Sequence, residues 1–280
     1  MNRLHVATGL CGWAACAEKL RVALARRFEH RFFERIPIYV FHRVRPLDGT
    51  LDPLGLRVSP EAFAASLQKL RERHTLHFVD DLVKGRFSGR TGRDAALTFD
   101  DGYADFLLHA FPVIERLRVP VTVFLTTSFV GTDRLLWWDE LLELSRRPGW
   151  PAEEDFFRSA QRLKFLSRPQ IDSLLCSRYG GNGDFAPEFR AANRGLTWDE
   201  VRRLRESGLV RFEPHGHAHV NYGSSNDEET RADITRCMDR LEVETGRRGE
   251  VLAYPYGGID DIRPETPAVV CACGIKAAFL

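Results

Sequence analysis

The chain has 280 residues, of which 44% are hydrophobic and 28% charged, an ordinary composition for a globular protein with one large domain or two small ones. Its net charge of +1 gives no electrostatic reason to expect nucleic acid as a partner. The six cysteines show no CxxC spacing. We therefore expect them to be mostly reduced, which favours a cytoplasmic setting.

Residues 1–35 differ from the rest of the chain because apolar side chains recur every four residues among several arginines. The apolar positions are Leu20, Leu24, Phe28 and Phe32. This pattern predicts an amphipathic basic helix, which either docks on its own domain, the interpretation we favour, or makes a peripheral membrane contact through residues 16–35. The stretch 4–17 is interrupted by polar residues and glycines and makes a poor signal peptide. We find no run of about 18 apolar residues, so we expect no membrane-spanning helix.

From residue 36 onward the pattern alternates between strands and helices. Strands are predicted at 36–41, 75–79, 95–99, 121–126, 209–212, 251–254 and 275–280, and helices at 60–74, through 106–114, and after capping boxes beginning at Thr197 and Ser225. The alternation predicts an α/β fold with a mainly parallel sheet, either closed as a barrel or open and doubly wound. No Gly-rich phosphate loop follows any predicted strand, and this favours the barrel.

Two adjacent carboxylates, Asp100 and Asp101, end the apolar strand at 95–99 and are followed by Gly102. Their side chains diverge at the strand end, so one can face a metal ion while the other faces a substrate. Two carboxylates this close do not both ionise readily in a dry pocket unless a cation or a shared proton relieves their repulsion. Alone, the pair could be helix caps; beside a cluster of histidines it indicates a catalytic site.

Three histidines fall within five residues, at His215, His217 and His219. Imidazoles at i and i+4 share one face of a helical turn, so His215 and His219 are expected to reach one ion. With one carboxylate they make a two-histidine, one-carboxylate site with open positions for water and substrate. We expect His217 to point to the opposite face and not to be a ligand. His42 is either a hydrogen-bonded core histidine or a site residue.

The segment 131–195 interrupts the alternation and is interpreted as an insertion on the rim of the fold. It is either a lid that contributes to substrate binding or a helical cap that shields apolar surface. Its paired residues Trp137 and Trp138 could stack on sugar rings, although we expect at least one of them to be a buried anchor.

These segments resemble the polysaccharide deacetylases of the chitooligosaccharide deacetylase type, which carry the NodB-homology domain. The resemblance is carried by Thr98-Phe99-Asp100-Asp101-Gly102, His215-Gly216-His217-Ala218-His219, Phe41-His42-Arg43-Val44 and Tyr254-Pro255-Tyr256-Gly257. It covers residues 36–280. It implies an irregular (β/α) barrel of seven to eight parallel strands.

The resemblance also implies roles for single residues. The implied metal ligands, for a divalent ion that is most often Zn²⁺, are Asp101, His215 and His219. Asp100 becomes the general base that takes a proton from the attacking water. The backbone N–H of Tyr256 is expected to hold the oxyanion, with Pro255 beside it at the substrate. Tyr103 could line the same cleft or serve packing alone.

This sequence departs from the family pattern at two places. Ala253 replaces the arginine that usually steadies the base, and no Leu-x-x-His segment with the general acid precedes Leu280. We therefore expect a barrel that lacks its final strand, a chain that is incomplete in function, and an unpaired edge that favours association. The alternative is that His42 or His217 donates the proton.

The leading hypothesis is a metal-dependent hydrolase of non-peptide carbon–nitrogen bonds, which removes N-acetyl groups from a sugar, oligosaccharide or polysaccharide. The first alternative is a catalytically silent carbohydrate-binding or scaffold domain that keeps the fold. A metal-dependent phosphoesterase is less favoured, because the sequence shows no basic cluster flanking the site to hold phosphate.

Overall fold

The computed structural model describes residues 5–7, 36–47, 52–87, 93–181 and 183–280. The apolar and basic positions that predicted the N-terminal helix, residues 20–35, lie outside these described residues. Of the first 35 residues only His5–Ala7 is described, and it forms a short strand, β1. Domain boundaries and membrane contact for that region stay predictions.

Six strands form the main sheet, and all their pairings are parallel. They are β1, β2 (Pro37–Phe41), β5 (Thr75–His77), β6 (Asp94–Phe99), β7 (Val121–Leu125) and β8 (Val210–Pro214). Their order is β1-β2-β6-β7-β8, and β5 pairs with the first half of β6. Every residue of β6 and β7 is buried, as expected for a parallel sheet covered on both faces. The predicted α/β fold with a parallel sheet is confirmed.

Two smaller parallel sheets complete the described strands. One pairs β3 (Arg43–Val44) with β4 (Arg57–Val58), and the other pairs β9 (Val251–Ala253) with β10 (Ala277–Phe279). Between β8 and β9 a side chain takes the place of the backbone ladder, because the buried Glu213 carboxylate accepts the N–H groups of Glu250 and Val251 at 2.7 and 3.0 Å. The described strands therefore pair in three separate sheets, and a continuous closed barrel stays a prediction.

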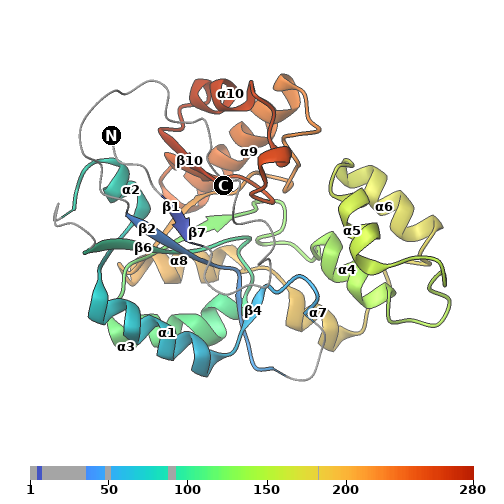
Figure 1. Ribbon diagram of the computed structural model, residues 1–280, viewed down its shortest axis with the longest axis horizontal. Helices are drawn as coiled ribbons and strands as arrows, with labels where there is room; N and C mark the ends of the chain where they lie inside the picture. Colours follow the sequence, from blue (N-terminus) through green and yellow to red (C-terminus); the bar gives the residue numbers. More distant parts are fainter. Residues whose placement is uncertain (1–4, 8–35, 48–51, 88–92, 182) are drawn as a thin grey trace.

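Helices cover both faces of the main sheet, with α1 and α3 on one side and α9 and α10 on the other (Figure 1). These are α1 (Pro60–Arg73), α2 (Val79–Val83), α3 (Phe111–Leu117), α8 (Trp198–Glu206), α9 (Asp227–Thr245) and α10 (Thr266–Ala272); a π-helical turn, Phe106–Ala110, precedes α3. In α1, Ser59 caps the backbone N–H of Ala62 and Pro60 opens the first turn, while Phe63 and Leu67 enter the core.

Some predicted boundaries differ from the structure. The strand predicted at 75–79 ends at His77, and Val79 instead begins α2, where it packs in the core. The second capping box lies one residue later than predicted, with Asn226 as the cap and Glu229 as its partner. The first box, Thr197 with Glu200, is confirmed.

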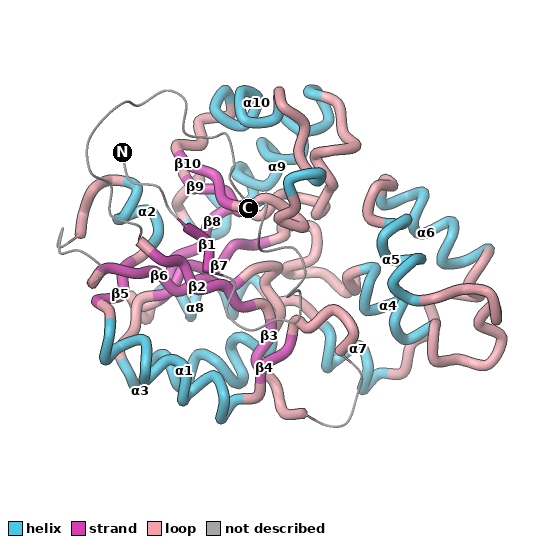
Figure 2. Tube along the Cα trace, in the orientation of Figure 1, coloured by secondary structure: helices cyan, strands magenta, loops and turns pink. Residues whose placement is uncertain are grey.

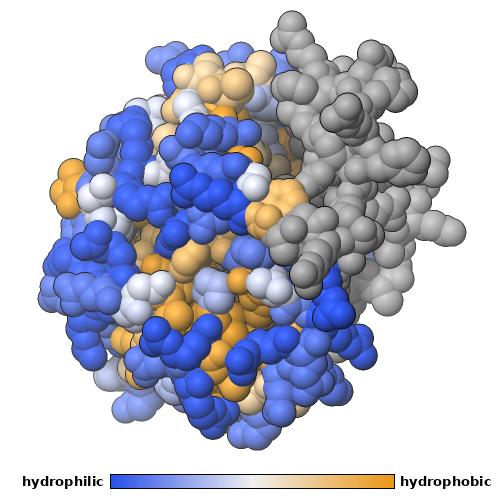
Figure 3. Space-filling view, turned by 90° about the vertical axis from the view of Figure 1, so that its left-hand side faces the viewer, coloured by the Kyte–Doolittle hydropathy of each residue, from blue (hydrophilic) through white to orange (hydrophobic). Residues whose placement is uncertain are grey.

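Four helices lie within the range predicted as an insertion; the first three stand beside the sheet as a group of their own, and the fourth lies closer to β4 (Figures 1 and 2). They are α4 (Trp137–Leu144), α5 (Phe156–Leu163), α6 (Arg168–Ser177) and α7 (Pro187–Asn193). They enclose a separate apolar cluster that includes Leu141, Leu163 and Ile171. On the side of the molecule away from this group, the surface is polar around an apolar centre (Figure 3).

Within the described part of the chain, no helix combines the length and the apolar character needed to cross a bilayer. The four described cysteines, Cys176, Cys237, Cys271 and Cys273, are free thiols.

Candidate metal centre

Asp101, His215 and His219 come together at the carboxyl ends of β6 and β8. The Asp101 Oδ1 atom lies 3.6 Å from His215 Nε2 and 3.3 Å from His219 Nε2, and all three side chains are buried. Their potential ligand atoms lie within 4.8 Å of one another. Two ligands bound tetrahedrally at about 2.0–2.1 Å from one zinc ion stand roughly 3.4 Å apart, so the spacing suits such an ion.

The histidine segment is a loop and not the helical turn that the i, i+4 spacing predicted. None of residues 215–219 is helical. Gly216 has φ +81° and His219 has φ +52°, and these left-handed residues turn the chain so that both outer histidines face Asp101. The sequence prediction named the residues that converge, but the local geometry on which it relied was wrong.

Residues with strained, left-handed backbone conformations are concentrated at this centre. Four described residues other than glycine have positive φ, and three of them are Asp101 (+70°), His219 (+52°) and Tyr256 (+67°). Left-handed backbone at non-glycine residues costs free energy and persists where surrounding contacts enforce it, commonly at functional sites. The fourth, Arg118, ends α3.

The two histidines are oriented in different ways. His215 Nδ1 lies 2.9 Å from the carbonyl oxygen of Ala253, which fixes its ring and leaves Nε2 facing Asp101. His219 Nδ1 has no hydrogen-bond partner among the described residues. Its imidazole is instead packed edge-on between Trp138 and Tyr256, with ring centroids 4.7 and 4.6 Å away.

The unsatisfied atoms at the centre fit a bound cation. Both carboxylate oxygens of Asp101 are buried without a hydrogen-bond partner among the described residues. Burial acts to raise the pKa of Asp101, yet the His219 imidazole, whose Nε2 lies 3.3 Å from Oδ1, lowers it to about 2. Burial lowers the pKa of His215 to about 3. An ionised carboxylate and a neutral imidazole are the forms that bind metal.

Asp100 precedes Asp101 in the chain and is not part of the potential ligand group. Burial and the negative charge of Asp101 raise its pKa well above the usual value, and its Oδ1 has no partner. Its Oδ2 lies 3.9 Å from His42 Nε2, and the His42 side chain is 32% exposed. His42 is thus beside the carboxylate pair, and its role at the site stays a prediction.

Tyr256 and Pro255 lie on the loop after β9, close to the histidines. The Tyr256 ring contacts His219, and its hydroxyl accepts a 3.1 Å hydrogen bond from Trp137 Nε1 in the insertion. Pro255 is buried. Trp137 and Trp138 are only 5% and 6% exposed, so both are buried anchors and neither presents a free ring to solvent.

The model of the polysaccharide deacetylase family matches residues 88–277. The chain belongs to the polysaccharide deacetylase family. Over 252 residues it is 23% identical to the poly-beta-1,6-N-acetyl-D-glucosamine N-deacetylase of Staphylococcus epidermidis, covering 85% of this chain and 66% of the relative. It is 24% identical over 172 residues to the enzyme of the same name from Escherichia coli, covering 60% of this chain and 22% of that one.

Among solved structures, the family fold is shared with the Streptococcus pyogenes deacetylase PplD, which was solved in complex with acetate. The TM-score is 0.56 at 15% identity, covering 86% of this chain and 81% of that one. This likeness concerns the fold alone.

A buried ionic network, which the sequence did not reveal, connects α4 to residues near Asp101 in this family member. Arg43 is 2% exposed and donates to Asp105 at 2.6 Å and, at 3.4 Å, to Asp139 on α4. Its guanidinium lies 3.9 Å from the centre of the Tyr103 ring. The Tyr103 hydroxyl donates to Asp139 at 2.6 Å and accepts from Trp138 Nε1 at 2.8 Å.

The Tyr103 side chain is 1% exposed, so it serves packing and does not line an open cleft. In the sequence, Arg43 was noted only as part of the motif Phe41-His42-Arg43-Val44. Its acidic partners lie 62 and 96 positions away, so no local pattern could have linked them.

Asp233 on α9 supports the histidine loop through hydrogen bonds, and the sequence analysis did not identify it. Its carboxylate accepts the backbone N–H groups of His217 and Ala218 at 3.0 and 2.8 Å, and the Tyr222 hydroxyl at 2.8 Å. A side chain at Gly216 would meet Asp233 Oδ2 at 2.7 Å, so the loop requires glycine there.

His217 faces away from Asp101 and lies outside the potential ligand group, as predicted. Its Nδ1 is 3.0 Å from Thr127 Oγ1. Burial lowers the pKa of His217, the charge of Asp233 acts in the opposite direction, and the positive charges of Arg236 and Arg134 lower it further.

Proposed function

We propose that this chain is a metal-dependent N-deacetylase that hydrolyses acetamido groups on an N-acetylglucosamine-containing polymer or oligosaccharide. The observation that carries the proposal is the convergence of Asp101, His215 and His219, with the unpaired carboxylate of Asp100 beside them. Membership of the family and the names of the two relatives support the substrate class.

In this proposal Asp101, His215 and His219 hold the ion. A divalent ion such as Zn²⁺ supplies Lewis acidity, which polarises the acetyl carbonyl and acidifies water. The chain's own residues handle the protons and the developing charge. The ionised carboxylate of Asp100, which lacks a partner at Oδ1, removes a proton from the attacking water as general base. The N–H of Tyr256 stabilises the oxyanion from the strained loop after β9.

His42 is the candidate that we propose for proton donation to the leaving amine. It lies 3.9 Å from the base and is partly exposed, so it can exchange protons with solvent. Ala253 stands where the family usually carries an arginine, and the His42 imidazole lies beside the Asp100 carboxylate at this site.

We further propose that the three sheets belong to one irregular barrel. The Glu213 carboxylate links β8 to the start of β9, and Phe279 on β10 packs in the apolar cluster that contains Ile38 on β2. These contacts bring the two ends of the strand series towards each other, as barrel closure requires.

Release of acetate is the experiment that tests the proposed activity. Purified protein loaded with Zn²⁺ is incubated with β-1,6-linked and β-1,4-linked N-acetylglucosamine oligomers, and acetate and free amine are measured. We expect equal amounts of both products from at least one oligomer, and none from the Asp100→Asn variant. Sugar binding without acetate release from any oligomer would favour the alternative, a silent carbohydrate-binding domain.

A further inference from the structure

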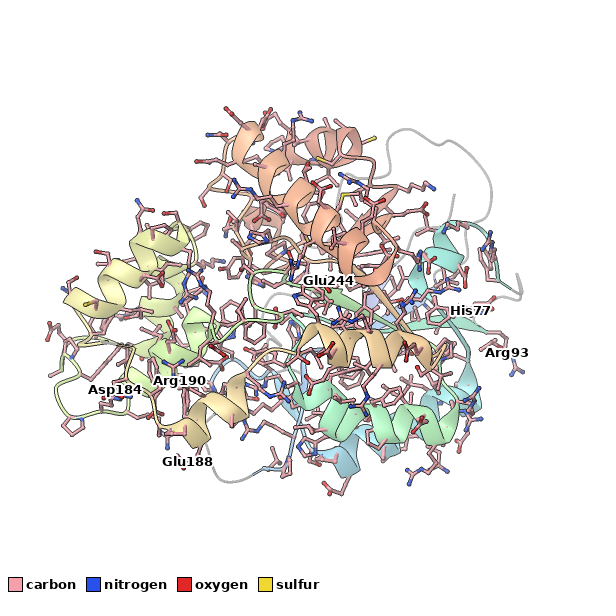
Figure 4. All side chains as sticks on the ribbon, turned by 180° about the vertical axis from the view of Figure 1, so that it is seen from behind. His77, Arg93, Asp184, Glu188, Arg190 and Glu244 are labelled. Atoms are coloured by element: carbon pink, nitrogen blue, oxygen red, sulfur yellow. The ribbon has the colours of Figure 1, made fainter. Side chains whose placement is uncertain are left out.

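A concave site of about 750 Å³ lies on the far side of the histidine loop from Asp101. Its walls come from the loop after β7, from α8 and from α9, which lie next to each other when the molecule is seen from behind (Figure 4). His217 forms part of its lining. The volume is within the range of pockets that hold small ligands or a few sugar units.

Three arginines line this site: Arg134 on the loop after β7, and Arg236 and Arg240, one helical turn apart on α9. Arg240 lies over the Trp198 ring at 5.0 Å and pairs with Glu244 at 2.7 Å. Arg134 and Arg236 are exposed and have no ion-pair partner among the described residues. The sequence had shown no basic cluster near the metal loop, because these positions are up to about a hundred residues apart in the chain.

The negative charge in the site is smaller than the positive charge. The acidic residue of the lining is Asp239, which already forms an ion pair with Arg248 outside the lining. The hydroxyl-bearing residues Ser128 and Thr132 supply further polar groups at the wall. Guanidinium groups without carboxylate partners, next to hydroxyls, are suited to carboxylate or phosphate oxygens.

The site shares its wall with the metal loop. The backbone N–H of Ser128 donates to the carbonyl of His217 at 2.8 Å, and that of Thr127 donates to Gly216 at 3.3 Å. Ser128 and Arg134 also line a small cavity that His219 borders. The concave site and the candidate metal centre therefore border the same loop, residues 215–219.

We propose that the concavity lined by Arg134, Arg236 and Arg240 is an anion-binding subsite, which takes a carboxylate or phosphate group carried by the saccharide substrate. The saccharide part of this assignment rests on the proposed function. The subsite favours an acidic or phosphate-bearing glycan over a neutral one. It also disfavours a heavily deacetylated product, whose free amines are cationic and are repelled by the guanidinium groups.

Equilibrium binding, which needs no turnover, tests the subsite. The full chain is titrated calorimetrically with trigalacturonate, with N-acetylglucosamine 1-phosphate, and with the neutral N-acetylglucosamine trimer. We expect one or both anionic probes to bind at least about ten-fold more tightly than the neutral trimer, and to weaken as salt is raised. Binding of only one anionic probe identifies whether carboxylate or phosphate is the recognised group.

Substitutions that remove positive charge and substitutions that remove negative charge make the test specific. Arg134→Gln combined with Arg236→Gln should weaken anion binding by about ten-fold or more, whereas Asp239→Asn should strengthen it. Arg231→Gln, on the same helix but outside the lining, should leave it unchanged. Circular dichroism checks that each variant is folded.

The subsite would be overturned if anionic and neutral probes bound equally, if neither anion bound, or if the double variant bound anions as tightly as the parent. Failure of acetate release would not affect this result, since binding is measured without hydrolysis. The two proposals can therefore fail independently.

Discussion

The indole of Trp138 lies edge-on to the imidazole of His219, with ring centroids 4.7 Å apart, and so connects α4 directly to the candidate metal centre. Because His219 Nδ1 has no hydrogen-bond partner among the described residues, packing is what orients this ring. Trp138→Leu should therefore weaken Zn²⁺ binding by roughly 10–100-fold, the loss typical when a supporting group of a metal ligand is removed. Competition with a chromogenic chelator measures the affinity.

The matched control is Trp150→Leu, also in the insertion, where the indole stacks on Tyr179 at 4.7 Å and touches no residue of the centre. It should bind Zn²⁺ like the parent protein. Equal affinity in Trp138→Leu and the parent would show that the aromatic contact does not position His219.

Proton donation by His42 predicts a dependence on the leaving group. His42→Gln should lower turnover of an N-acetylated sugar by about 10²–10⁴-fold, while hydrolysis of 4-nitrophenyl acetate, whose phenolate leaves without a proton, should change little. Asp100→Asn should slow both reactions, because both need the attacking water to be deprotonated. His109→Gln, on the π-helical turn, serves as the histidine control. A loss of the same size on both substrates in His42→Gln would contradict the assignment.

Arg43 is expected to be the most sensitive single position for stability. Arg43→Met leaves Asp105 and Asp139 buried without their cation, which should lower the free energy of unfolding by about 3–5 kcal/mol. Arg202→Met removes a surface pair with Glu244 and should cost at most about 1 kcal/mol (Figure 4). Urea unfolding of the three proteins gives both values. A loss below that of the control would show that the buried network contributes little.

Glu154 gives the insertion a predictable acid sensitivity. Hydrogen bonds from Ser159 and Arg178 lower the pKa of this carboxyl from 4.5 to about 2. A lowered folded-state pKa contributes stability that is complete above the unfolded value of 4.5 and is lost as pH falls through about 2. Glu154→Gln should therefore melt at a lower temperature than the parent near neutral pH, and the gap should close between about pH 4.5 and pH 2.

Thermal melts across that range, with the exposed Glu153→Gln as control, measure the gap. A gap that stayed constant with pH would mean that the Glu154 charge is not what stabilises the insertion.

The sequence predicted the elements whose causes are local. The helix α1 begins after the N-cap Ser59, at Pro60, as predicted, and β6 ends directly before the carboxylate pair. Both boundaries were predictable because capping and apolar runs depend on neighbouring residues. The convergence of Asp101, His215 and His219 was also predicted, although the turn of helix expected for His215 to His219 is a loop shaped by Gly216 and supported by Asp233.

What the sequence could not give depends on contacts between distant segments. Three groups of contacts join residues that are dozens of positions apart: the Arg43 network, the packing of His219 between Trp138 and Tyr256, and the site lined by His217, Arg134 and Arg236. No periodicity or spacing encodes such pairs. The position of His42 beside Asp100 belongs to the same class, since it depends on β2 pairing with β6.

The most direct test of the account is the metal content of two variants that differ by one position. The parent and Asp100→Asn should each contain close to one Zn²⁺ per chain by elemental analysis after exchange into metal-buffered solution, while Asp101→Asn should contain almost none. Asp100→Asn should at the same time release no acetate, because it retains the ion and lacks the base. Full metal content in Asp101→Asn, or loss of metal from Asp100→Asn, would contradict the assignment of ligand and base on which the proposed function depends.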